Sequence, residues 1–230
     1  MGLSHSPSLV LSGLTLCLDA ANTKSYPGSG TTWTDLSGRG NIGTLTNGPT
    51  YNSANGGSIV FDGTNDYTTC GNILNFTTES FTFNVWFYLS NFIPPGDPVQ
   101  GPILFYKGIF QQNGYYCQFG QNGSINFVTN QSGAYQASGT AAGIVSLNTW
   151  YCLSLVRSGS NVTIYVNGNQ SSSSNSHINP TSSSDSFLLC SYNFGIYSNF
   201  RISQFSTYNR ALSAAEVSQN FNALRGRYGI

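Results

Sequence analysis

Residues 80–90, SFTFNVWFYLS, alternate large apolar side chains with other side chains at a period of two. The side chains on one face are Phe81, Phe83, Val85, Phe87 and Leu89. Because successive side chains of a strand point to opposite faces, this pattern predicts a strand with one face in a core. The other face carries Trp86 and Tyr88. We favour their burial under another element, with ligand contact as the alternative.

The same signal recurs at short intervals along the chain. Residues 150–157 and 161–170 predict a hairpin, and so do residues 115–120 and 125–130. Further strands are expected at 14–19, 57–62, 66–70, 103–107, 186–190 and 199–208. Irregular segments are expected at 22–56, 91–101 and 171–185. Short strands separated by turns predict an all-β sandwich or barrel, and 230 residues suit one such domain.

One helix is expected near the C-terminus. Ser213 and Glu216 have the spacing of a capping box, in which each side chain satisfies a free backbone N–H of the other residue. Val217, Phe221 and Leu224 then follow at helical spacing. We therefore expect the helix to pack this apolar stripe against the sandwich.

Composition limits the partners. Charged residues make up 7% of the chain, against about 25% in an ordinary domain, and the formal net charge is zero. No basic stripe is present to neutralise phosphates, so nucleic acid is not expected as a partner. No apolar run reaches the length of a membrane span, and the N-terminus lacks the basic start of a cleaved signal. A near-neutral surface resists self-association poorly, which makes a homo-oligomer a reasonable expectation.

The cysteines and histidines do not form a metal-binding pattern. Five cysteines are widely spaced, without a CxxC motif, and we expect free thiols in or beside strands. His5 and His177 lie in terminal or polar segments, where we expect exposed loop side chains. Neither histidine has metal-ligand spacing or lies near a nucleophile motif.

The carboxylates are few, and two of them share the stretch FDGTNDY at residues 61–67. Asp62, Asn65 and Asp66 supply oxygen donors that suit calcium, but the same residues are ordinary turn formers. We favour a hairpin turn and keep calcium as a second interpretation. The remaining acids are Asp19, Asp35, Glu79, Asp97, Asp185 and Glu216. No strand carries alternating acids that could face one cleft, so we predict no catalytic residue.

Sugar binding needs aromatic faces with amide or hydroxyl groups beside them. Tyrosines with neighbouring asparagines stand in or near the expected loops at Tyr115, Tyr116, Tyr135, Tyr192 and Tyr197. Aromatic side chains at this frequency also fill sandwich cores. These tyrosines are therefore candidates for a ligand site, with the core as the alternative.

Four stretches resemble a known family in their order along the chain. They are GSIVFDGTNDYTTC, SFTFNVWFYLS, WYCLSLVRSGSNVTIYVNG and ISQFSTYNRALSAAEVSQNF. The order is similar to that in LamG-like, concanavalin A-like jelly rolls and covers about residues 9–228. The resemblance implies one LamG-like domain over 1–230, folded as a two-sheet antiparallel jelly-roll sandwich with a short C-terminal helix. It also implies glycan or protein binding, and a calcium candidate at Asp62 in the family's FDG turn.

The opening stretch, residues 4–41, resembles the start of LamG-type structural proteins of tailed bacteriophages. This implies a place on a virion, as tail fibre, adhesin or capsid decoration. Together with the LamG-like resemblance and the aromatic and amide residues of the loops, it predicts a non-enzymatic module that binds host-surface glycan. It would be made in the host cytoplasm, which suits free thiols. A purely structural virion protein that binds other capsid or tail subunits is the alternative. A glycoside hydrolase is a third possibility, but the acidic strand motif of those relatives has no counterpart here.

Overall fold

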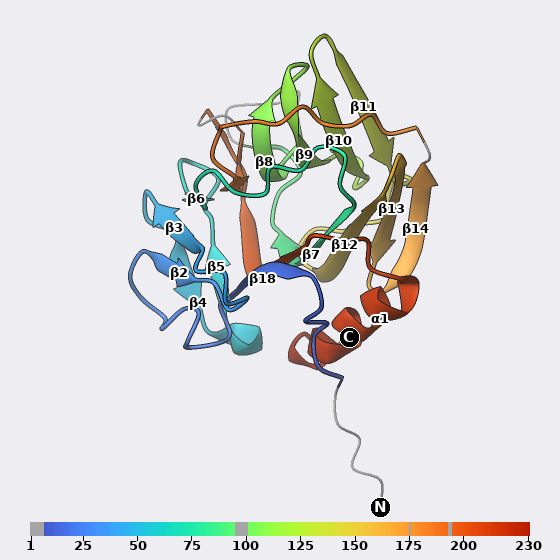
Figure 1. Cartoon of the computed structure of the whole chain (residues 1–230). Helices are drawn as coiled ribbons and strands as arrows, with labels where there is room; N and C mark the ends of the chain where they lie inside the picture. Colours follow the sequence, from blue (N-terminus) through green and yellow to red (C-terminus); the bar gives the residue numbers. More distant parts are fainter. Residues whose placement is uncertain (1–6, 95–100, 175, 193–194) are drawn as a thin grey trace, which may run out of the picture.

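Two antiparallel sheets form most of the chain (Figure 1). The structure is a computed structural model that describes residues 7–94, 101–174, 176–192 and 195–230. His5 and Asp97 lie outside the described residues. The helical elements are α1 (Ala214–Leu224) and the 3-10 turns η1 (Ala54–Gly56) and η2 (Arg225–Arg227). The predicted all-β, two-sheet sandwich with one short C-terminal helix is confirmed.

The first sheet has the strand order β14-β13-β12-β7-β18-β5-β4, and β1 also pairs with β18. Its strands are β1 (Leu14–Asp19), β4 (Thr50–Asn52), β5 (Ser58–Val60), β7 (Phe81–Leu89), β12 (Trp150–Ser158), β13 (Asn161–Val166), β14 (Asn169–Ser174) and β18 (Phe200–Tyr208).

The second sheet has the strand order β11-β10-β9-β8-β15-β6-β3-β2. Its strands are β2 (Thr32–Thr34), β3 (Ile42–Thr46), β6 (Tyr67–Thr69), β8 (Ile103–Ile109), β9 (Asn113–Phe119), β10 (Ile125–Gln131), β11 (Ala134–Gly139) and β15 (Leu188–Leu189). A small hairpin, β16 (Ser191–Tyr192) with β17 (Ile196–Tyr197), follows β15.

The core lies between the two sheets and is centred on β7. All five side chains predicted to face inward from β7 have no exposed surface and belong to one apolar cluster. The Phe83 ring joins the two layers, since its centroid lies 4.5 Å from Phe105 of the second sheet and 6.2 Å from Phe205 of the first. Each such buried side chain contributes about 1.5–3 kcal/mol to folding. The period-two prediction for this strand is confirmed.

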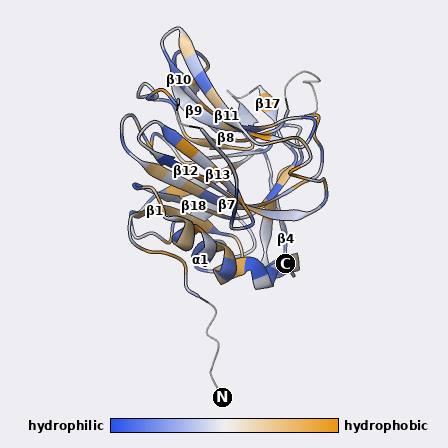
Figure 2. Cartoon of the chain, turned by 90° about the vertical axis from the view of Figure 1, so that its right-hand side faces the viewer, coloured by the Kyte–Doolittle hydropathy of each residue, from blue (hydrophilic) through white to orange (hydrophobic). Residues whose placement is uncertain are grey.

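The outer face of the first sheet is covered by the C-terminal segment, so the molecule has three layers (Figure 2). Trp86 is fully buried there, stacked on Tyr228 at 4.1 Å and on Phe221 at 5.7 Å between ring centroids. Tyr88 is half-buried, and the Arg201 guanidinium lies 4.8 Å from its ring. Trp86 is therefore a packing residue, as favoured from the sequence.

The helix α1 is held at its start by the predicted capping box. The Ser213 hydroxyl accepts the Glu216 N–H, and the Glu216 carboxylate accepts the Ser213 N–H at 2.9 Å. Val217 and Leu224 are buried against the first sheet, as predicted. The Asn220 amide oxygen accepts the Val10 N–H at 2.8 Å, which ties the start of the described chain to this helix.

Several strands were not predicted. The segment 22–56 contains β2, β3 and β4, and β11 and the serine-rich β14 were also missed. These strands are short or lie at sheet edges, and few of their side chains are buried. Such a strand has no alternating apolar residues by which it could be recognised in the sequence. It forms because a neighbouring strand offers backbone hydrogen bonds, and not because its own side chains are buried.

Candidate functional site

The FDGTNDY turn joins β5 to β6 and is held by its own two carboxylates. Asp62 Oδ1 accepts the Thr64 N–H at 2.7 Å, and Asp66 Oδ2 accepts the Asp62 N–H at 3.2 Å. The Asn199 side-chain amide donates to the Asp62 carbonyl oxygen at 3.3 Å. These are the local side-chain bonds that favour Asp and Asn in turns, so a turn is confirmed here. The predicted hairpin was wrong, because β5 and β6 belong to different sheets and do not pair.

Calcium at Asp62, Asn65 and Asp66 stays a prediction. Burial raises the pKa of Asp66, and the neighbouring Asp62 carboxylate raises it further. A bound cation would relieve that repulsion. Within the described ranges no three His, Cys, Asp or Glu side chains gather into a metal-binding group. A calcium ion here would therefore depend on backbone and amide oxygens as well, and the Asn65 carbonyl already accepts the Asn47 side-chain amide at 2.9 Å.

The other described carboxylates serve local structure. Asp19 pairs with Arg227 at 2.9 Å, and Glu216 pairs with Arg210 at 2.6 Å. The remaining contacts are Asp35 with Ser37, Glu79 with Thr77 and Asp185 with Ser183. A glycosidase needs two carboxyl groups about 5–10 Å apart across one cleft. None of these contacts gives that arrangement within the described part of the chain.

The five candidate tyrosines occupy different places. Tyr115 and Tyr116 lie inside β9 and not in a loop, and they point to opposite sides of the second sheet. Tyr115 belongs to the core, where its hydroxyl donates to the Leu74 carbonyl at 2.7 Å. It is therefore a packing residue, and its selection as a ligand candidate was wrong because adjacent strand residues face opposite ways.

Tyr116, by contrast, joins Tyr135 and Tyr192 on the outer face of the second sheet. Together with two further residues these side chains form a row that we call the tyrosine face, which consists of Tyr106, Phe110, Tyr116, Tyr135 and Tyr192. Successive ring centroids are 4.5 Å apart for Tyr192 and Tyr106, 5.8 Å for Tyr106 and Tyr116, 6.4 Å for Tyr116 and Phe110, and 4.9 Å for Phe110 and Tyr135. The rings come from β8 and the turn after it, from β9 and β11, and from β16 of the small hairpin.

Access to the tyrosine face differs along the row. Tyr106 and Tyr116 are nearly buried by their neighbours, Phe110 and Tyr192 are partly exposed, and 49% of Tyr135 is exposed. Burial raises the pKa of Tyr116 to about 12, with Tyr192 and Tyr135 adding to the shift. Its hydroxyl therefore stays protonated at neutral pH. Tyr197, the last sequence candidate, packs on Tyr67 at 6.2 Å in the adjoining part of the sheet.

The strands below the tyrosine face offer amides, and the cation of β8, Lys107, is buried with its ammonium donating to Asn72 and to the Asp185 carbonyl. β9, β10 and β11 contain no charged residue. Gln118 and Asn126 pair across β9 and β10, and Asn130 pairs with Tyr135 across β10 and β11. The buried Asn130 Nδ2 has no hydrogen-bond partner within the described residues, while its Oδ1 accepts the Gln111 N–H at 3.2 Å. Gln118 and Asn126 are partly exposed, so this surface combines rings with neutral amides.

His177 is buried, so the predicted exposure was wrong. Its ring lies between the hydroxyls of Thr129 and Ser138 and stacks on Phe127 at 5.7 Å. Burial, together with the neighbouring Arg157 cation, lowers the pKa of His177 to about 4. The polar sequence around the residue hid this role, because the burial comes from contacts with β10 and β11.

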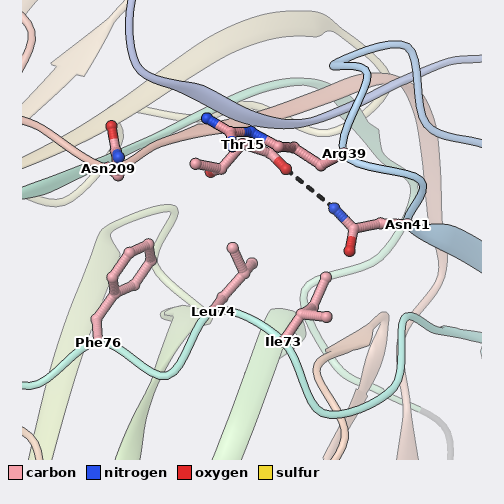
Figure 3. Close-up of a pocket in the computed structure, with 7 residues that line it drawn as sticks. All are labelled: Thr15, Arg39, Asn41, Ile73, Leu74, Phe76 and Asn209. Carbon is pink, nitrogen blue, oxygen red and sulfur yellow. Dashed lines mark hydrogen bonds between the residues drawn. The ribbon is translucent and has the colours of Figure 1, made fainter.

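A pocket of about 340 Å³ opens between β1 and residues 73–76, and we call it the Arg39 pocket. It is lined by Thr15, Arg39, Asn41, Ile73, Leu74, Phe76 and Asn209. Figure 3 shows the polar residues on one side and the three apolar side chains on the other. These residues form no motif in the sequence, because they come from four segments that only the fold brings together.

The five cysteines are free and buried in the structure, as predicted. Burial raises the thiol pKa of Cys17 and of Cys70 to about 12, so these sulfurs are not thiolates at neutral pH. Of the helices among the described residues, none has the length and apolar content to cross a membrane.

Fold and geometry together define an antiparallel β-sandwich whose second sheet presents an aromatic, uncharged outer face. Residues 62–218, well over half of the chain, match the sequence profile of Laminin_G_3, described as the concanavalin A-like lectin/glucanases superfamily. The chain therefore belongs to this superfamily. This confirms the LamG-like resemblance seen in the sequence. No curated protein sequence matches the chain.

Solved structures with the same fold include binding domains of clostridial toxins. The binding domain of Paraclostridial Mosquitocidal Protein 1 is 18% identical with a TM-score of 0.71, and that of botulinum neurotoxin serotype D is 13% identical with the same score. Each match covers 92% of this chain and 52% of the other. The botulinum neurotoxin type G receptor binding domain is 19% identical, with a TM-score of 0.68. The chain spans about half the length of these proteins, and at such identities the likeness shows the fold.

Proposed function

We propose that the protein is a non-enzymatic binding module that holds a cell-surface glycan on the tyrosine face. The observation that carries this proposal is the row of five rings beside neutral amides on an uncharged sheet face. The C–H faces of a sugar ring pack on aromatic rings, and sugar hydroxyls exchange hydrogen bonds with amide and phenol groups. A neutral surface of this kind suits a neutral sugar better than a phosphate or a nucleic acid.

The structural neighbours support a binding role. Two are described as binding or receptor-binding domains. A third belongs to botulinum neurotoxin type C, whose cell entry is described as dependent upon interaction with two ganglioside molecules. Those descriptions belong to chains about twice as long as the matched part. The tyrosine face of this chain is therefore the main support for glycan binding, and the toxin domains with the same fold are secondary support.

The same proposal includes a location on the virion of a tailed bacteriophage. The resemblance of residues 4–41 to phage structural proteins supports it. Five free, buried cysteines also suit a protein made in a reducing cytoplasm. Calcium in the FDGTNDY turn would be an accessory feature of such a module.

A glycan array with the purified protein, with and without calcium, tests the proposal. We expect binding to neutral glycans that Tyr135→Ala weakens by about tenfold or more, since stacking on a ring is lost. Ile42→Ala is the matched control, because Ile42 is similarly exposed, at 51%, and lies on another strand of the same sheet. The absence of any glycan bound by the wild-type protein would refute the proposal.

Light scattering separates glycan binding from the structural alternative. An assembly that forms at high protein concentration and is lost in Tyr135→Ala would make the tyrosine face a subunit contact. That result, together with an empty array, would favour a virion protein that binds other subunits. A monomer that binds glycans would favour the module.

A further inference from the structure

The Arg39 pocket has two unlike walls, and this limits what it can bind. Ile73, Leu74 and Phe76 form an apolar wall that faces polar side chains across the pocket (Figure 3). Its volume of about 340 Å³ lies at the small end of the range for ligand sites. A group of one ring with an apolar side and a polar side matches these walls better than a long chain does.

The apolar wall is held in an uncommon backbone conformation. Leu74 has a φ of +58°, in the left-handed region that non-glycine residues seldom adopt. Its carbonyl oxygen accepts the buried Tyr115 hydroxyl at 2.7 Å and the Phe76 N–H at 2.9 Å. Backbone strain that a buried hydrogen bond maintains is typical of ligand sites, because it fixes the wall before a ligand arrives.

The polar wall presents unused hydrogen-bonding groups. The Asn41 amide nitrogen donates to the Thr15 carbonyl at 3.0 Å and to Asp35 Oδ2 at 3.2 Å, which fixes the side chain. Its oxygen points toward the apolar wall (Figure 3). The exposed Asn209 side-chain amide makes no hydrogen bond with the described residues. Both amides can therefore serve the hydroxyl groups of a ligand.

Arg39 gives the pocket its charge. Its exposed guanidinium makes no ion pair or hydrogen bond with another described residue. Asp35, the acid nearest in the chain, is occupied by the Cys17 N–H at 2.8 Å and the Ser37 hydroxyl at 2.7 Å. A carboxylate suits a free guanidinium, since the two form charge-assisted, often bidentate hydrogen bonds.

We infer that the Arg39 pocket binds an acidic sugar residue of the hexuronate type. The sugar carboxylate pairs with the Arg39 guanidinium, and the sugar hydroxyls form hydrogen bonds with the Asn41 and Asn209 side chains. The C–H side of the sugar ring packs on Ile73, Leu74 and Phe76. The inference deepens the proposed glycan-binding function and rests on it. It concerns a second site that shares no residue with the tyrosine face.

Titration with methyl β-D-glucuronide and methyl β-D-glucoside tests this inference, because the two probes differ in the carboxylate. Binding is followed by calorimetry and by the NMR signals of the side-chain amides. We expect saturable glucuronide binding, about tenfold or more tighter than that of the glucoside, with shifts at Asn41 and Asn209. Arg39→Gln removes the preference. Lys24→Gln keeps it and serves as the control, since Lys24 is also an exposed cation without an ion pair to another described residue.

Three results would overturn the inference. One is the absence of saturable glucuronide binding. Another is an equal loss of the preference for the glucuronide in Arg39→Gln and in Lys24→Gln. The third is glucuronide binding that persists in Arg39→Gln and disappears in Tyr135→Ala, which would move the acidic sugar to the tyrosine face and still support the proposed function. Glucuronide binding that survives Tyr135→Ala and depends on Arg39 supports the inference even if the array shows no neutral glycan.

Discussion

Acidification is expected to destabilise the protein through His177. The pKa of this buried ring is lowered from 6.5 to about 4, first by burial and then by Arg157. The unfolded chain therefore takes up a proton as the pH falls below about 6.5, while the folded protein takes it up only near 4. At about 1.4 kcal/mol per pKa unit, this removes about 3 kcal/mol of the free energy of unfolding between neutral pH and about pH 4.

Urea unfolding at a series of pH values measures this effect. The comparison variant is His177→Gln, which can still bond to the hydroxyls of Thr129 and Ser138 but does not titrate. We expect the loss of stability from pH 7 to 4 to be about 3 kcal/mol smaller in the variant, because other groups titrate alike in both proteins. Equal pH dependence in the two proteins would refute the reasoning, as would an NMR titration that places the pKa of His177 near 6.5.

Three further perturbations are expected to act on separate parts of the fold. Trp86→Ala should lower the free energy of unfolding by about 3–5 kcal/mol in urea, because it opens the stack with Phe221 and Tyr228; a loss below about 1 kcal/mol would contradict this packing. Ser213→Ala should cost about 1 kcal/mol through the lost cap, measured by thermal unfolding, with Ser218→Ala as a control within the helix. If the FDGTNDY turn binds calcium, millimolar calcium raises Tm relative to chelator, the free energy of unfolding rises by about 2.7 kcal/mol at a hundredfold excess over Kd, and Asp62→Ala abolishes both changes. The same Tm with calcium and with chelator would leave FDGTNDY as a turn alone.

The central strand of the fold could be predicted from the sequence, because burial of one face of a strand requires an apolar residue at every second position. In β7 each inward residue is apolar and each was placed correctly. The capping box likewise marks the start of α1 by two residues three apart. Both patterns involve residues close together in the sequence, so they can be recognised without knowing which other elements pack against them.

The candidate site was harder to predict because it depends on pairing between strands. Tyrosine content indicated an aromatic surface, but Tyr115 and Tyr116 differ only in the face that the strand gives them. Tyr106 and Phe110 were missed, since Tyr106 meets Tyr116 through the register of β8 with β9. The Arg39 pocket gave no signal at all, because its walls come from segments up to almost two hundred residues apart.

The described chain begins and ends on the same side of the molecule. The Gln219 side chain donates to the Ser8 carbonyl at 2.8 Å, and α1 with the following turn lies against the first sheet. In Figure 2 this end of the molecule lies beyond the first sheet, and β8, β9 and β10 lie on the opposite side. A protein joined at residue 7 or residue 230 would therefore lie on the side of the first sheet. The tyrosine face, on the second sheet, would then point away from that protein.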